Sequence, residues 1–272
     1  MHSVFTHAVN LLFDGQLVTL LAEPRSLVPY GCTFSKDVSF PAYGLVPGMA
    51  AVLMPEGVET GGQTFLWRDA VQTELSADAA PYTAQPETVS RSIGILRDLL
   101  AEEGETLGLS PLVTGNAPNV YSRFLQPRLQ RLTESVRRGD GADAIAASAA
   151  CAGCGMGLTP SSDDLLTGYF AALYVLSGAG RTADLRPFLP DMAEAAAAKT
   201  NLISGAFLTE SARGLVSQDF LILLQCIFSG APERAISNAA ARVASFGSTS
   251  GRDMLTGLVL AIQHHNGGKN CG

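Results

Sequence analysis

A glycine-rich stretch from Gly153 to Gly168 holds the residues best suited to bind an anion. Its sequence, GCGMGLTPSSDDLLTG, supplies alternating glycines, then three hydroxyl groups and two adjacent carboxyl groups, and it continues into an apolar helical pattern. A glycine loop that ends at a helix N-terminus presents unpaired backbone N–H groups at the positive end of the helix dipole. The stretch therefore predicts a site for a phosphate or carboxylate group.

The ligand-binding groups expected in this stretch are backbone amides and hydroxyls. They are the amides of Gly155, Gly157 and the 159–162 turn, with the hydroxyls of Thr159, Ser161 and Ser162. The alternative is a well-capped buried helix, whose serines satisfy the first-turn N–H groups of the helix itself. Both interpretations stay open from the sequence.

Asp163 and Asp164 are adjacent, so on a helix their side chains point about 100° apart and cannot both face one ligand. One is expected to cap the helix or tie the loop, and the other to orient an amine donor or hold a cation beside an anionic substrate. Both are catalytic candidates, and Asp164 is preferred because a later segment repeats its setting. A purely structural role for both is the alternative.

That later segment, 253–257, has the sequence DMLTG and repeats DLLTG at 164–168, with Ser248 and Ser250 matching Thr159 and Ser161. If the echo is structural, small faces at both glycines let two helices approach closely and direct two sets of amides at one pocket. It predicts Ser250 and Asp253 as substrate-binding residues and Arg252 as a catalytic cation. Chance is the alternative, because glycine, serine and leucine are common here.

Two further hydroxyls, on Thr200 and Ser204, lie four residues apart on one helix face and are predicted walls of the site. The alternative is that they bond to backbone carbonyls one turn earlier. No serine, histidine and aspartate can be combined into a catalytic triad, which disfavours acyl-enzyme chemistry.

The five cysteines are an odd and scattered set, which argues against a disulfide framework. Cys151 and Cys154 form a C-x-x-C pair, but zinc needs two more ligands at suitable spacing, and His264 and His265 are expected in a tail. Buried thiols are the favoured interpretation over a redox or zinc role. We expect no metal and no cofactor.

The net charge of −7 and the pI of about 5.1 come with no long basic run, which makes nucleic acid an unexpected partner. The N-terminal residues lack the pattern of a signal peptide. The longest apolar run, 220–228, is about half of what spans a bilayer. The sequence predicts a cytoplasmic protein with no membrane association.

The chain is expected to have an α+β fold with two domains. Residues 1–80 predict an antiparallel β sheet or barrel, with strands at 4–13, 16–21, 38–40, 50–54 and 64–75 and a hairpin turn at Asp14-Gly15. Residues 81–272 predict a helical bundle. Its helices are expected near 87–103, 118–138 with Asn116 as the cap, 142–152, 161–177, 189–199, 201–213, 219–228, 232–245 and 251–263, before a disordered tail at 266–269.

The G-x-G-L-T-P-S-x-D-D-x-L-x-G pattern, the Thr200, Ser204 and Leu208 helix, and the G-x-x-S-G-x-D-x-L-x-G segment at 247–257 together resemble a bacterial family long labelled a domain of unknown function. One branch of that family is a subunit of the oxamate carbamoyltransferase of anaerobic allantoin degradation. The resemblance covers about residues 110 to 263. One departure is Ser162, where the family usually has glycine, and this serine puts a close backbone approach to a ligand in doubt.

The resemblance implies carbamoyl transfer between carbamoyl phosphate and oxamate, with partner subunits of a different family. Two hypotheses follow. The chain is a carbamoyltransferase-type enzyme subunit that binds a small anionic substrate at the glycine loop, or it is a non-catalytic anion-binding or scaffold subunit of a metabolic complex. Turnover by the purified chain alone distinguishes them.

Overall fold

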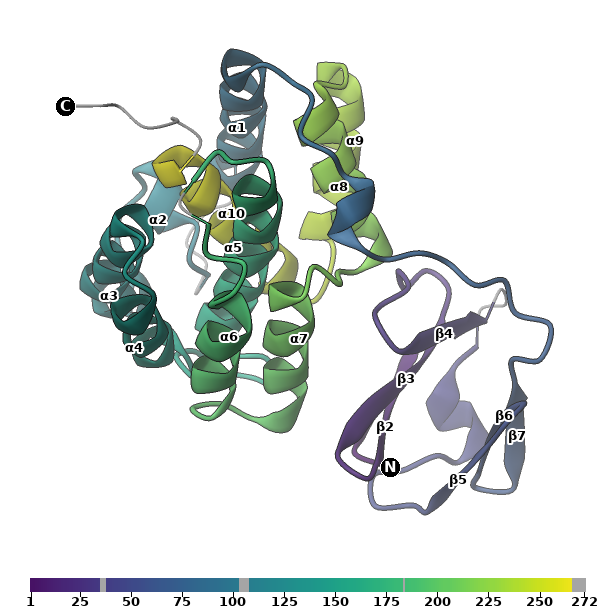
Figure 1. The fold of residues 1–272 in the computed structure, drawn as a ribbon. Coiled ribbons are helices and arrows are strands. Elements are labelled where there is room, and N and C mark those ends of the chain that lie inside the picture. The colour runs from purple at the N-terminus through teal and green to yellow at the C-terminus, as the bar shows by residue number, and fades with distance from the viewer. Residues whose placement is uncertain (35–37, 103–107, 183, 266–272) are drawn as a thin grey trace. The chain divides into compact units, whose positions relative to one another are not determined.

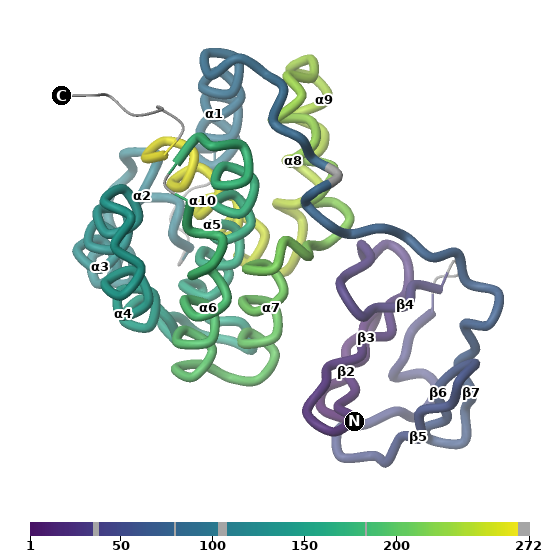
Figure 2. Tube along the Cα trace, viewed as in Figure 1, coloured from purple at the N-terminus to yellow at the C-terminus, as the bar shows by residue number. Residues whose placement is uncertain are grey.

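The computed structural model describes residues 1–34, 38–102, 108–182 and 184–265, and the chain divides after Leu75 into two compact units. The first unit contains the strands and the second contains the α-helices (Figure 1; Figure 2 traces the same view). The predicted α+β class, with strands first and helices after them, is confirmed. Within the described residues, no helix has the length and apolar character needed to cross a membrane.

The N-terminal unit holds two separate sheets. One is four-stranded in the order β1-β2-β3-β4, and the other is three-stranded in the order β5-β6-β7. Asp14 and Gly15 both have positive φ, 47° and 86°, and form the predicted hairpin turn between β2 and β3. The strands are β1 (Ser3–Phe5), β2 (Ala8–Phe13), β3 (Gln16–Ala22), β4 (Gly31–Phe34), β5 (Ala51–Met54), β6 (Gly57–Thr60) and β7 (Gln63–Leu66).

Several predictions for this unit need correction. The described strands form no closed barrel, and β3 pairs with β4 in parallel, because the intervening loop returns the chain before the second strand begins. The predicted strand 4–13 is a hairpin that turns between Phe5 and Ala8. The predicted strand 38–40 is absent, since Phe40 begins a short 3-10 helix, and the segment 64–75 is extended only to Leu66.

The C-terminal unit is helical, as predicted. Its α-helices are α1 (Pro86–Ala101), α2 (Pro111–Thr114), α3 (Val120–Arg138), α4 (Gly141–Cys151), α5 (Ser161–Gly178), α6 (Leu189–Ala197), α7 (Leu202–Ala212), α8 (Gln218–Ser229), α9 (Glu233–Ala244) and α10 (Ser250–His265). The predicted end of the first helix at 103–104 and the predicted tail at 266–269 lie outside the described residues.

Helix α3 begins later than predicted. Asn119, not Asn116, is its cap: the Asn119 side-chain oxygen accepts from the Ser122 amide at 2.9 Å, and its side-chain nitrogen donates to the Gly108 carbonyl at 2.7 Å. Both asparagines satisfy the local preference for a cap residue. Asn119 also bonds to Gly108, which lies outside the local cap pattern. The helix therefore begins at the asparagine that has this additional contact.

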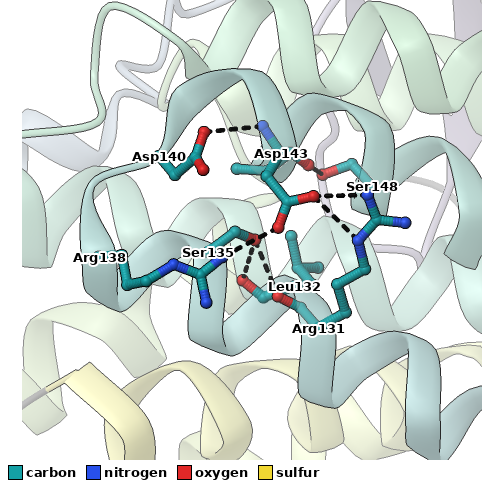
Figure 3. Close-up of polar contacts among 8 residues, drawn as sticks. Arg131, Leu132, Ser135, Arg138, Asp140, Asp143 and Ser148 are labelled. Carbon is teal, nitrogen blue, oxygen red and sulfur yellow. Dashed lines mark hydrogen bonds and ion pairs between the residues drawn. The ribbon is translucent and has the colours of Figure 1, made fainter.

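Helix α4 is fixed to α3 by the side chains drawn in Figure 3. Asp143 accepts from Arg131 Nε at 2.9 Å and from Arg138 Nη2 at 3.1 Å, while Asp140 caps the helix by accepting from the Asp143 amide at 3.0 Å. The hydrogen bond from Arg131 holds the pKa of Asp143 below its usual value. These contacts position α4, whose last residue, Cys151, leads into the glycine-rich loop.

Helix α5 lies inside the helical unit, where α10 crosses it (Figure 1). Every residue of α5 from Ser161 to Leu173 is buried. A Cβ atom on Gly168 would lie 2.0 Å from the Met254 carbonyl oxygen, and a Cβ atom on Gly257 would lie 1.9 Å from the Leu165 carbonyl oxygen. The two contacts are reciprocal, so the predicted structural echo and its close helix approach are confirmed.

The C-terminal end of α10 differs from the expected tail. The helix continues to His265, whose side chain is buried and whose Nε2 lies 2.8 Å from the Tyr169 hydroxyl of α5. Burial is the main cause that lowers the pKa of His265 to about 3. The histidine therefore packs α10 against α5 as a neutral ring.

The glycine crossing predicts a large effect of one methyl group. Gly168→Ala should lower the free energy of unfolding by about 3 kcal/mol or more, because the Met254 carbonyl belongs to a packed helix and cannot move aside. Gly94→Ala is the matched control: Gly94 lies in α1 with open space where a Cβ would stand, and this variant should gain up to about 1 kcal/mol. Urea unfolding measures both. Equal stabilities of the Gly168→Ala variant and the wild type would contradict the close approach.

Candidate functional site

The loop between α4 and α5, here called the glycine loop (residues 152–160), depends on glycine at two positions. Gly153 and Gly155 have φ of 76° and 133°, values that favour glycine. A Cβ atom on Gly153 would lie 2.6 Å from the Lys199 carbonyl oxygen, and one on Gly155 would lie 2.4 Å from the Ser161 amide nitrogen. Backbone conformation and space therefore both require glycine there.

Asp163 and Ser162 tie the glycine loop to the helices. Asp163 Oδ1 accepts from the Gly153 amide at 2.7 Å, and its other oxygen accepts from the Thr200 hydroxyl. Ser162 Oγ accepts from the Cys154 amide at 2.8 Å, while the Ser162 amide donates to the Cys154 carbonyl at 2.9 Å. Asp163 is thus the carboxyl group that ties the loop, and Ser162 keeps the turn despite replacing the family's usual glycine.

Burial raises the pKa of Asp163 above its usual value, and several hydrogen bonds oppose that rise. The hydrogen bond from the Gly153 amide opposes the rise most strongly, followed by those from the hydroxyls of Thr200, Ser204 and Ser162. The structure therefore brings the predicted wall residues Thr200 and Ser204 together at Asp163. Their hydroxyls are used inside the protein at this carboxyl group.

Five consecutive amide groups, from Gly155 to Thr159, donate no hydrogen bond to any acceptor in the described parts of the chain. Met156, Gly157 and Leu158 are exposed, so their N–H groups are open to solvent. Successive unpaired amides next to a helix N-terminus form a favourable environment for an anion. By contrast, the amides of Asp163 and Asp164 already donate to the Pro160 carbonyl, and these two amides are used inside the turn.

The starts of α5 and α10 meet beside this loop. Thr159 Oγ1 lies 3.1 Å from Ser250 Oγ, which joins the two segments that the sequence echo had matched. Ser250 is the first residue of α10 and Ser161 is the first residue of α5, where its side chain is buried. Two helix N-termini, and their positive dipole ends, therefore converge on one place.

Asp164 lies between these helix starts and is buried, with 5% of its surface exposed. Its Oδ2 atom has no hydrogen-bond partner among the described residues. Burial raises the pKa of Asp164 to about 8; a hydrogen bond from Ser250 opposes the rise, the charge of Asp253 adds to it, and Thr159 also opposes it. The Asp164 carboxyl group is therefore protonated at neutral pH.

The matched carboxyl group, Asp253, is fully buried in α10. Its Oδ1 accepts from the Leu109 amide at 2.6 Å, just as Asp163 accepts from the Gly153 amide. Each helix start therefore uses one carboxyl group to hold an incoming segment of chain. Asp164 has no such backbone donor.

Arg252, the predicted cation, contacts α1 through one nitrogen of its guanidinium. Its Nη1 donates to the Leu99 carbonyl of α1 at 3.1 Å. Its neighbour Asp253 faces α5, and successive residues on a helix point about 100° apart. This bond engages Nη1 alone, and the assignment of Arg252 to the site stays a prediction.

Two residues near the glycine loop were missed from the sequence. Asn201 caps α7 by accepting from the Ser204 amide at 3.1 Å, and its side-chain nitrogen donates to the Leu158 carbonyl at 2.8 Å. Lys199, whose carbonyl lies against Gly153, has an exposed side chain that forms no ion pair among the described residues. The sequence contained a signal for each residue. Asparagine before an apolar helix is a typical cap, and Lys199 is the one lysine among the described residues of the helical unit.

The C-x-x-C pair offers no reactive thiol. Burial raises the pKa of Cys151 to about 12 and also raises the pKa of the less buried Cys154. Both are free thiols. Within the described residues, no group of three or more histidine, cysteine, aspartate or glutamate side chains is placed to hold a metal ion.

The raised pKa of Asp164 predicts a pH dependence of stability. Because its pKa is about 8 in the folded chain and about 3.9 in an unfolded one, the folded state holds the extra proton and loses stability as the pH rises between these values. Asp164→Asn should remove a slope approaching about 1.4 kcal/mol per pH unit. Urea unfolding from about pH 5 to about pH 8 measures this slope.

Asp140→Asn is the control, since Asp140 caps the start of α4 and asparagine caps equally well. This variant should keep the wild-type slope. If Asp164→Asn and the wild type have parallel pH profiles, Asp164 does not hold the proton.

Comparison with known families covers both units of the chain. Residues 151–262, which include the whole glycine loop, α5 and most of α10, match the family described as oxamate carbamoyltransferase subunit AllH. Residues 1–76 match the AllH family N-terminal domain. No curated protein and no solved structure gives a significant match. The resemblance inferred from the motifs is thereby confirmed, and the chain belongs to the AllH family.

Proposed function

We propose that this chain is a subunit of an oxamate carbamoyltransferase and that its glycine loop binds the small anionic substrate, carbamoyl phosphate or oxamate. The observation that carries the proposal is the run of unengaged amides from Gly155 to Thr159 beside two converging helix N-termini. Amides and hydroxyls bind phosphate and carboxylate oxygens without a metal or cofactor. The family description supports the reaction class.

The state of the carboxyl groups is compatible with an anionic ligand. Asp164 is neutral at pH 7 because burial raises its pKa to about 8, so it does not repel the anion. A protonated carboxyl group can also donate a hydrogen bond, as the hydroxyls of Thr159 and Ser250 can. Lys199, whose carbonyl lies against Gly153, has an exposed side chain that forms no ion pair among the described residues and is a candidate source of positive charge.

The reaction itself needs no nucleophile from the chain. The oxamate amide nitrogen attacks the carbonyl carbon of carbamoyl phosphate, the bond from that carbon to the phosphate oxygen breaks, phosphate leaves, and the nitrogen loses a proton. The protein contributes positioning and hydrogen-bond donors for the oxyanion that develops on the carbonyl oxygen. The unengaged loop amides are the groups that we assign to this task.

A second candidate is a non-catalytic anion-binding or scaffold subunit. The position of Arg252 favours it, because the predicted cationic clamp for a second anion is engaged with Leu99 in α1. Assays of oxamate carbamoylation by the chain alone and by the chain with its partner subunits distinguish these candidates. Activity that requires the partners, with unchanged anion binding by the chain alone, supports a shared site.

Anion binding should appear as a gain in stability. Carbamoyl phosphate or oxamate at about 100 times its Kd should add about 2.7 kcal/mol to the free energy of unfolding. Thr159→Val and Ser250→Ala should each weaken binding by about tenfold, since each removes one hydroxyl donor. Thermal unfolding with each anion, and with phosphate and oxalurate, measures the shift.

The control is Ser245→Ala, in which the lost hydroxyl bonds to the Arg242 carbonyl at the end of α9. This variant should bind like the wild type. If none of the four anions stabilises the wild-type chain, the glycine loop is not a site for them in the isolated chain; if Ser250→Ala binds normally, the hydroxyl assignment is wrong.

A further inference from the structure

Exposed apolar side chains gather at the glycine loop. Met156 and Leu158 of the loop and Leu202 of α7 are 69%, 46% and 40% exposed. The Asn201 side chain donates to the Leu158 carbonyl at 2.8 Å, which joins the loop to the start of α7. These three residues, here called the loop patch, therefore form one apolar surface beside the unengaged amides.

Two more exposed apolar residues lie at the start of α3. Val120 is 66% exposed and Phe124 is 45% exposed, and the Arg128 guanidinium stacks over the Phe124 ring at 3.7 Å. Burial raises the pKa of Cys154 and the charge of Arg128 opposes that rise, so Arg128 lies near the loop. Apart from these five residues, Phe188 is the one large apolar side chain that is exposed among the described residues of the helical unit.

We propose that the loop patch is the docking surface for a different subunit of the carbamoyltransferase, and that this subunit covers the anion bound at the loop. The inference rests on the proposed function for the identity of the occupant, since the family is described as an enzyme subunit. Large apolar side chains grouped on a surface are typical of protein contacts. Here two of them, Met156 and Leu158, belong to the run of unengaged amides itself.

The charged groups near the loop indicate which side chains the partner's surface carries. Besides the neutral Asp164, the carboxyl groups of Asp163 and Asp253 lie at the helix starts, and Lys199 is the one lysine in the described part of the helical unit. The two nearest arginines donate to backbone carbonyls, Arg128 to Phe124 and Arg252 to Leu99. The partner's surface is therefore apolar and carries at least one arginine or lysine directed toward the anion.

A partner that covers the loop would also reduce the competition between water and the anion for the loop amides. Met156, Gly157 and Leu158, at the centre of this run of amides, are exposed, so water competes with a small anion for hydrogen bonds there. A partner that excludes water lowers the local dielectric constant and strengthens every contact between amide and anion. The apolar rim is suited to this exclusion.

The test compares assembly of the complete enzyme with loop-patch variants. The double variant Met156→Asp and Leu158→Asp should bind the co-purified partner subunits at least tenfold more weakly, because it places two charges on an apolar interface. Val71→Asp is the control: Val71 is 90% exposed, and this variant should assemble normally. Sedimentation of the mixed subunits at several concentrations gives each Kd.

Hydrogen exchange of the wild-type subunits makes a second, independent test. The amides of residues 156–159 should exchange rapidly in the isolated chain and at least tenfold more slowly in the complex. Unchanged exchange, normal assembly of the double variant, or self-association of the isolated chain through the patch would each overturn the proposal. Anion binding is measured separately on the isolated, uncharged double variant Met156→Gln and Leu158→Gln, which keeps the backbone amides and adds no negative charge, so failure of the docking surface is distinguishable from failure of the anion site.

Discussion

The close crossing of α5 and α10 is the constraint on which the helical unit depends. Gly168 and Gly257 allow each helix to approach a carbonyl oxygen of the other, so that even one methyl group has no room at either position. The crossing lies within the first two turns of both helices, and it therefore also fixes their N-termini. Thr159 and Ser250 meet at 3.1 Å because the axes are held together just beyond them.

Bringing two helix starts into the interior leaves their polar groups in need of partners. A buried carboxyl group without hydrogen bonds costs several kcal/mol, whereas one that accepts backbone amides is stabilised. Asp163 and Asp253 meet this requirement with the amides of Gly153 and Leu109, which come from the segments that enter the site. Two buried carboxyl groups thus fix the glycine loop and the chain before α2.

The sequence predicts the parts of this arrangement that arise from local spacing. The helix periodicity, the hairpin at Asp14-Gly15 and the repeated D-x-L-T-G segment each have a backbone cause that a short window contains. It does not predict which helix a side chain faces. Arg252 was assigned to the site because it stands in the second motif, and the bond of its Nη1 to the Leu99 carbonyl of α1 depends on helix packing that a short window does not contain. The parallel pairing of β3 with β4 likewise depends on the path of a loop.

Asp164 is the residue at the start of α5 for which a structural and a functional explanation differ most. Capping and loop attachment are already performed by Asp163 and Ser162, whose oxygens accept the amides of Gly153 and Cys154. Asp164 adds no amide contact, its Oδ2 has no partner among the described residues, and burial raises its pKa to about 8. A carboxyl group held neutral in that place makes the fold less stable at high pH. Strongly perturbed carboxyl groups concentrate at functional sites, which supports the proposal that Asp164 contacts the ligand.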